Sequence, residues 1–142
     1  MLVANHNPCS ESPPEPGRPG VMVPVRSREL SERCVLITAS GDVDASTAPG
    51  LCDSVQRHAA GYRQLVLDLS DVDFFGTAGY SLLHRLHARC AHTAVDWVLV
   101  AGSEVARLLR VCDPDGILPT APNIVSAVAT LARITQLRNG LR

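Results

Sequence analysis

The sequence has 142 residues, of which 46% are hydrophobic, and this length suits one domain that buries a core without a metal or a disulfide. Its formal net charge of −1, with no run of like charges, excludes the basic footprint of a nucleic-acid-binding protein, so no nucleic-acid partner is expected. All 13 basic residues are arginines, which excludes every enzyme class that needs a P-loop, Schiff-base or general-base lysine.

The beginning of the chain differs in composition from the rest. Residues 1–20 hold five of the ten prolines and few apolar side chains, so they are predicted to be a disordered Pro-rich tail, and residues 21–142 the folded domain. No apolar run approaches the ~20 residues of a transmembrane helix, and the N-terminus lacks a basic region followed by a hydrophobic one. A cytoplasmic protein without a membrane partner is therefore expected.

Two strands are predicted at the start of the domain. Residues 21–25 are apolar but include Pro24, which cannot donate to a sheet ladder and so suits an edge strand. Residues 34–39 form a stronger strand pattern, and the short polar segment between the two predicts a hairpin. Gly41 is then expected to supply a turn with positive φ.

A first helix is predicted over residues 49–60. Asp44, Ser46 and Thr47 are candidate caps for its first turn, which tolerates a proline. Gly61 is expected to end it.

The centre of the sequence predicts a buried strand, an acidic turn and a second helix. Residues 65–69 are a short apolar run typical of a strand covered on both faces, and a turn over residues 70–73 follows. Thr77 is the predicted N-cap of the helix, whose start also suits an anion. One apolar stripe of about three turns is predicted to face the core. It consists of Gly79, Leu82, Leu83, Leu86 and Cys90.

Two further strand and helix pairs complete the predicted order. Residues 96–101 are a strand, Ser103 is the cap candidate of a helix that ends by Asp113, residues 117–120 are a short strand, and Asn123 caps the last helix. The order β-β-α-β-α-β-α-β-α predicts an α/β fold. In this fold the helices pack against a mainly parallel sheet whose first strand is antiparallel.

A group of acidic residues is better explained without a metal. Asp68, Asp71 and Asp73 crowd one predicted loop, where a divalent ion is the alternative to a solvated turn. Acidic turn residues usually stay hydrated, so the solvated turn is favoured.

The histidines of the second helix also invite a metal interpretation. His84 and His87 lie three residues apart, but they lack carboxylate or cysteine partners at ligand spacing on the same face. With Tyr80 they form a stripe beside the core side of the helix, which favours a solvated or partner-facing surface.

The five cysteines are odd in number and widely separated, with no Cys-x-x-Cys pair to indicate a zinc or thioredoxin site. Reduced, mostly buried thiols are the favoured interpretation. A redox-sensing pair of Cys90 with Cys112, near two helix ends, is the alternative hypothesis.

Motifs for catalysis are missing from the sequence. It has no Gly-x-Ser-x-Gly elbow, no Gly-x-Gly-x-x-Gly loop, no recognisable paired His and Cys, and no carboxylate cluster with metal spacing. The chain is therefore predicted to be a binding module that uses no cofactor and no metal, and not an enzyme.

Two segments carry a recognisable pattern. Residues 67–79 read Leu-Asp-Leu-Ser-Asp-Val-Asp-Phe-Phe-Gly-Thr-Ala-Gly, and residues 41–49 read Gly-Asp-Val-Asp-Ala-Ser-Thr-Ala-Pro. They resemble the STAS domain, the module of anti-sigma factor antagonists, over residues 21–138. In that family a strand runs into Asp-Ser-Ser/Thr-Gly at a helix start, and a Gly-Glu-Leu-Asp loop precedes Ala-Thr-Ala-Pro. The Ser/Thr directly before the Gly is phosphorylated by a partner kinase.

The phosphorylation loop departs from the family pattern. Gly76 stands in place of the Asp, Thr77 matches the first Ser, and Ala78, at the phosphoacceptor position, has no oxygen to phosphorylate. Either Thr77 accepts phosphate from a shifted position, or the module is never phosphorylated and is controlled in another way. The second is favoured, because a kinase aligned on Gly79 would find Thr77 displaced by one residue and used as a cap.

The resemblance implies a protein that binds an anti-sigma factor of the histidine-kinase-like ATPase type, thereby frees a sigma factor, and so regulates transcription. The alternative is a STAS subunit of another complex, such as a lipid-transport ABC system, and nucleotide or small-molecule binding at the loop is a weaker third. The implied partner-binding residues are Asp42, Asp44, Gly76, Thr77, Ala78, Gly79 and Tyr80.

Overall fold

Residues 22–140 form five strands and four helices in the predicted order. The computed structural model describes these residues, so the predicted tail over residues 1–20 lies outside them. The strands are β1 (Val25–Glu29), β2 (Cys34–Val43), β3 (Gln64–Phe75), β4 (Asp96–Val100) and β5 (Thr120–Ala121). The helices are α1 (Ala48–Ala59), α2 (Thr77–Thr93), α3 (Gly102–Cys112) and α4 (Ile124–Gly140).

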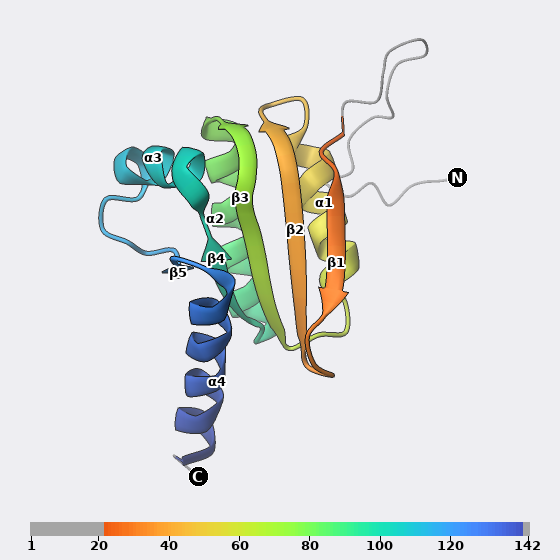
Figure 1. The fold of residues 1–142 in the computed structure, drawn as a ribbon, viewed down its shortest axis with the longest axis vertical. Coiled ribbons are helices and arrows are strands. Elements are labelled where there is room, and N and C mark those ends of the chain that lie inside the picture. Colours follow the sequence, from red (N-terminus) through yellow and green to blue (C-terminus); the bar gives the residue numbers. More distant parts are fainter. Residues whose placement is uncertain (1–21, 141–142) are drawn as a thin grey trace.

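The strands make one sheet in the order β1-β2-β3-β4-β5, as Figure 1 shows. β1 runs antiparallel to β2, and every other neighbouring pair is parallel. The predicted α/β fold, with a mainly parallel sheet and an antiparallel first strand, is therefore confirmed. β4 pairs with β3 only from Gln64 to Asp68, so the remainder of β3 is paired with β2 alone.

Helices cover the two faces of the sheet unequally. α1, α2 and α3 contribute to the main core on one face, and α4 covers β3 and β4 on the other (Figure 1). Leu65 and Leu67 of β3 face the main core, whereas Val66 faces α4, and all three are fully buried. Each such side chain contributes roughly 1.5–3 kcal/mol of hydrophobic stabilisation. The prediction that residues 65–69 form a strand covered on both faces is confirmed.

The first strand lies further along the chain than the sequence predicts. β1 begins at Val25, which pairs with Ala39, and continues through polar residues to Glu29. Pro24 has no amide hydrogen to donate, although its carbonyl still accepts the Ser40 amide at 3.2 Å. The strand after it was missed because its exposed polar residues carry no apolar alternation.

The central strand is longer than predicted. Instead of an acidic turn over residues 70–73, β3 continues to Phe75 and stays paired with β2 across two register shifts. Gly41, with φ 93°, sits within β2 at these shifts, so its positive φ serves a bulge and not a turn after the strand. Val72 and Phe75 remain buried, while Asp71 and Asp73 face solvent.

Helix caps were predicted with mixed success. The Asn123 side chain accepts the Ser126 amide at 2.8 Å, which confirms the predicted cap of α4. Ser103 does not cap α3, because that helix already begins at Gly102 and its N-cap, Ala101, makes no side-chain bond. α1 and the stripe of α2 are confirmed, and all five stripe residues are buried.

The last strand is shorter than predicted and shifted. β5 contains only Thr120 and Ala121. The Asp113 carboxylate accepts the amides of Ile117 at 2.9 Å and Leu118 at 3.0 Å. These amides are therefore occupied by a side chain and do not pair with β4, which explains why the apolar residues at 117 and 118 form no strand.

Candidate functional site

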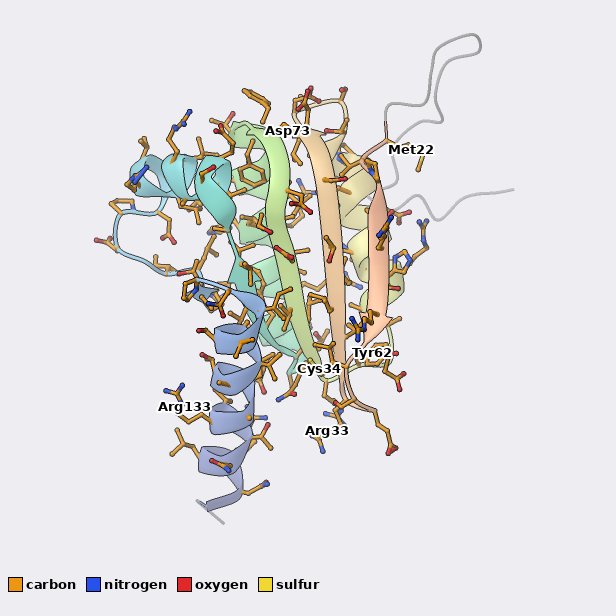
Figure 2. The ribbon with its side chains drawn as sticks, viewed as in Figure 1. Met22, Arg33, Cys34, Tyr62, Asp73 and Arg133 are labelled. Carbon is orange, nitrogen blue, oxygen red and sulfur yellow. The ribbon has the colours of Figure 1, made fainter. Side chains whose placement is uncertain are left out.

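The two segments with the family pattern meet at the carboxyl ends of β2 and β3. The Gly76 amide donates a hydrogen bond to the Val43 carbonyl at 3.0 Å, and Asp42 lies opposite Phe74 in the parallel ladder. We call the resulting surface, residues 42–47 and 71–80, the rim. Asp73 marks it at the upper end of β3 in Figure 2. All seven predicted partner-binding residues lie in it.

The first turn of α2 is fixed by a glycine against an aromatic ring. Gly79 is buried, and a Cβ atom added to it would stand 2.5 Å from the Phe75 ring. Its amide donates to the Gly76 carbonyl at 2.9 Å, which closes the turn. Gly79 therefore shapes the rim from beneath and presents no surface of its own.

Thr77 is not the N-cap of α2. The cap position is Gly76, which has extended backbone, and Thr77 is the first helical residue, without a capping hydrogen bond. The prediction was wrong by one residue because the extension of β3 brings Gly76 to the point where the chain turns. Thr77 is exposed, so its hydroxyl is accessible on the rim.

Ala78, at the position of the family's phosphoacceptor, is half-buried. It lines a cleft of about 280 Å³ between α1 and α2, together with Ala48, Pro49 and Leu82. The methyl group thus belongs to a largely apolar cleft beside the rim, and Thr77 supplies the exposed side chain of this turn.

Asp44 organises the loop that joins β2 to α1. Its carboxylate accepts the Ser46 hydroxyl at 2.7 Å and the amides of Ser46 at 2.9 Å and Thr47 at 3.1 Å. These bonds, that of the Ser46 hydroxyl first, lower the pKa of Asp44. The Thr47 hydroxyl donates to the Asp42 carbonyl at 2.8 Å. Asp44 is therefore held by its own loop, whereas Asp42 is exposed.

The predicted surface stripe of α2 divides into two parts. Tyr80 is half-buried and its ring centroid lies 6.1 Å from that of the exposed His84. His87 instead accepts the indole N–H of the buried Trp97 at 3.1 Å through Nδ1. The expectation of a partner-facing His87 was wrong, because α2 packs on β4 and turns this imidazole toward the strand.

Phe74 is a rim residue that the sequence argument did not single out. Its side chain is 51% exposed, although the neighbouring Phe75 is only 5% exposed. The signal was available, because successive residues of a strand point to opposite faces and only one of two adjacent phenylalanines reaches the core.

The acidic residues of β3 do not form a loop cluster. Asp68 is 7% exposed, and its carboxylate accepts the Ser70 amide at 3.0 Å and hydroxyl at 2.6 Å. The solvated-turn interpretation was therefore wrong for Asp68, which lies inside the sheet, while Asp71 and Asp73 are exposed on the strand. Within residues 22–140, no three His, Cys, Asp or Glu side chains are placed to hold a metal ion.

Two buried thiols, those of Cys34 and Cys90, are not activated. Cys34 and Cys90 are buried and free, and Cys112 is free and half-buried. Burial raises the pKa of Cys90 to about 11 and also raises the pKa of Cys34, which disfavours the reactive thiolate. The pairing of Cys90 with Cys112 stays a prediction. Cys52 is disulfide-bonded, so the expectation of reduced thiols is wrong at this position.

No helix within residues 22–140 is both long enough and apolar enough to cross a membrane.

Sequence comparison identifies relatives of this chain. The STAS domain family model matches residues 26–127. Osmosensory protein A of Mycobacterium tuberculosis is 32% identical over 116 residues, which cover 79% of this chain and 73% of that protein. The anti-sigma-F factor antagonist RsfA of the same organism is 31% identical over 102 residues, which cover 69% of this chain and 80% of RsfA.

Solved structures share the fold. An anti-sigma factor antagonist from Mycobacterium paratuberculosis superposes with a TM-score of 0.68 at 23% identity, over 76% of this chain and 92% of that chain. The unphosphorylated anti-sigma factor antagonist SpoIIAA superposes with a TM-score of 0.58 at 12% identity, over 78% of this chain and 98% of that chain. The family model matches residues 26–127, which are most of this chain. The chain therefore belongs to the STAS domain family.

Proposed function

We propose that this STAS domain protein is an anti-sigma factor antagonist, which binds an anti-sigma factor and thereby frees a sigma factor to direct transcription. The observation that carries the proposal is the 3.0 Å bond from the Gly76 amide to the Val43 carbonyl, because it joins both family segments into one exposed rim. RsfA, at 31% identity, carries this function in its name.

The proposed partner is an anti-sigma factor of the histidine-kinase-like ATPase type, and the proposed compartment is the cytoplasm, where sigma factors act. The rim is built for contact and not for catalysis: its ordered polar groups, those of Asp44 and Thr47, are engaged within their own loop. Asp42, Thr77 and Tyr80 remain as side chains that a partner can touch.

We also infer that the module is not controlled by phosphorylation at the usual position, because Ala78 has no oxygen and lines an apolar cleft. Thr77 is the competing acceptor, since its hydroxyl is exposed. Incubation with the bound anti-sigma factor and ATP, followed by intact mass measurement, is expected to show no added phosphate. A phosphate located on Thr77 by peptide mapping would refute this inference.

The function is tested by direct binding. Each anti-sigma factor of the source organism is titrated with the full chain by calorimetry, and its sigma factor is then added to measure displacement. One of them is expected to bind and to release its sigma factor. If none binds, or if the chain instead associates with a lipid-transport ATPase, the proposal is wrong.

A variant locates the contact surface. Thr77→Arg places a long side chain at the centre of the rim and is expected to weaken binding at least about tenfold. Ala129→Arg adds the same side chain on the exposed side of α4 and is the matched control. Equal affinities of the two variants would place the interface elsewhere, even if the wild-type chain binds.

A further inference from the structure

We propose that Phe74 is the apolar anchor of an acidic docking surface, and that the anti-sigma factor receives it in a pocket bordered by arginine or lysine side chains. This inference rests on the proposed function, because it names the chemistry of the partner surface that the rim fits.

The Phe74 ring is exposed where the fold has no need for it. The Phe74 side chain is 51% exposed, whereas that of Phe75, the next residue of β3, is buried in the core. Aromatic side chains bury large areas and dominate the binding energy of protein interfaces. Single exposed apolar residues are common on protein surfaces. Phe74 is singled out because it lies within the segment that carries the family pattern.

Phe74 is carried by paired backbone, and its ring has room beside Gly76. Phe74 lies in the β2–β3 ladder opposite Asp42, and a Cβ atom on Gly76 would stand 3.2 Å from its Cε2 atom. Gly76 replaces the Asp of the family pattern, so the missing side chain leaves room for the ring. Because the backbone that carries this side chain is already paired in the sheet, binding costs little backbone entropy.

The charged residues of the rim itself are all acidic. Asp42, Asp71 and Asp73 are exposed, and the lowered pKa of Asp44 keeps that carboxyl ionised at neutral pH. Residues 40–48 and 70–84 contain no arginine. Complementary potentials across an interface speed association and reject wrong partners, so the rim fits a basic surface.

The acidic side chains of the rim also exclude other binding partners. A second copy of the rim would set carboxylates against carboxylates, and nucleic acid or an anionic lipid surface would be repelled in the same way. A basic protein surface with an apolar pocket remains as the occupant.

Truncation of the ring tests the anchor. Phe74→Ala is expected to weaken binding of the anti-sigma factor about 30-fold, and Phe74→Tyr to retain most of the affinity. Val125→Ala is the matched control, because Val125 is 79% exposed on α4, away from the rim. It is expected to bind like the wild type. Thermal unfolding of each variant shows that the fold is intact.

Removal of charge tests the acidic surround. The double variant Asp42→Asn with Asp73→Asn is expected to slow association several-fold at about 50 mM NaCl and to flatten the salt dependence up to about 500 mM. Asp115→Asn, an exposed acid in the loop after α3, is the control. The rate is read by stopped-flow fluorescence of Trp97 or of a dye on the partner.

The outcomes separate the two proposals. If Thr77→Arg abolishes binding but Phe74→Ala binds like the wild type, the rim is the interface and the anchor is refuted. If the association rate does not fall with added salt, the basic partner surface is refuted. If no anti-sigma factor binds the wild-type chain, both proposals fall.

Discussion

Gly79 lies directly against the ring of Phe75, since a Cβ atom on Gly79 would stand 2.5 Å from Cε1 and Cζ of that ring. Gly79→Ala is expected to destabilise the fold by about 1–3 kcal/mol, because a buried ring has to move. Gly50→Ala in α1, where an added Cβ meets nothing within 4 Å, is expected to stabilise by about 0.5–1 kcal/mol. Urea unfolding measures both, and a Gly79→Ala protein as stable as the wild type would contradict the close packing.

Gly102 meets backbone and not a side chain. It has φ +74°, and a Cβ there would stand 2.6 Å from the Ser70 Cα. Gly102→Ala is therefore expected to cost more than Gly116→Ala, whose φ is +66° but whose added Cβ meets nothing within 4 Å. The control carries only the backbone penalty of about 1–2 kcal/mol. Chemical unfolding measures the free energy of unfolding of both variants. Equal losses of stability would show that the β3 backbone moves to accommodate the added Cβ without cost.

The indole of Trp97 depends on His87 for its hydrogen bond. His87→Ala leaves a buried N–H without its acceptor and is expected to cost about 1–3 kcal/mol. Trp97 is the only tryptophan of the chain, so its fluorescence reports both the unfolding midpoint and the local change. His84→Ala, one turn earlier and exposed, is the matched control and is expected to leave the midpoint unchanged.

Asp44 makes the rim loop sensitive to acid. Its pKa lies below the ordinary value of about 3.9, chiefly because the Ser46 hydroxyl bonds the carboxylate. A lowered folded-state pKa contributes stability above the unfolded-state pKa, and this contribution is lost as the pH falls through the folded-state pKa. Urea unfolding of Asp44→Asn is expected to show less stability than the wild type at pH 7, and the difference is expected to shrink below about pH 4. A constant difference would show that the carboxylate's charge is not involved.

Much of the fold follows from residue patterns that report burial directly. The helix α2 and the strand at residues 65–69 were predicted correctly, because their apolar side chains repeat with the spacing of the faces that are buried in the structure. β1 and the end of β3 were misplaced because their exposed polar residues are held by pairing with β2, which depends on residues distant in the sequence. The register shifts that allow this pairing are marked in the sequence only by Gly41, a glycine that adopts positive φ.

The rim was found from the family pattern, but the roles within it were not. Asp42 and Asp44 were both predicted to contact a partner, and only the bonds from Ser46 and Thr47 show that the Asp44 carboxylate is occupied. His87 and His84 look equally exposed until Trp97 is placed beside one of them. Which side chains remain free is a property of tertiary packing.

Beyond Asp68, β3 has a neighbouring strand on one side only, and at Ser70 the start of α3 approaches its backbone most closely. The docking surface thus stands on a two-stranded ribbon steadied by a helix that the partner need not touch. We expect a side chain in place of Gly102, at the first turn of α3, to displace this ribbon. Such a change is expected to weaken the proposed docking, although every residue of the rim is unchanged.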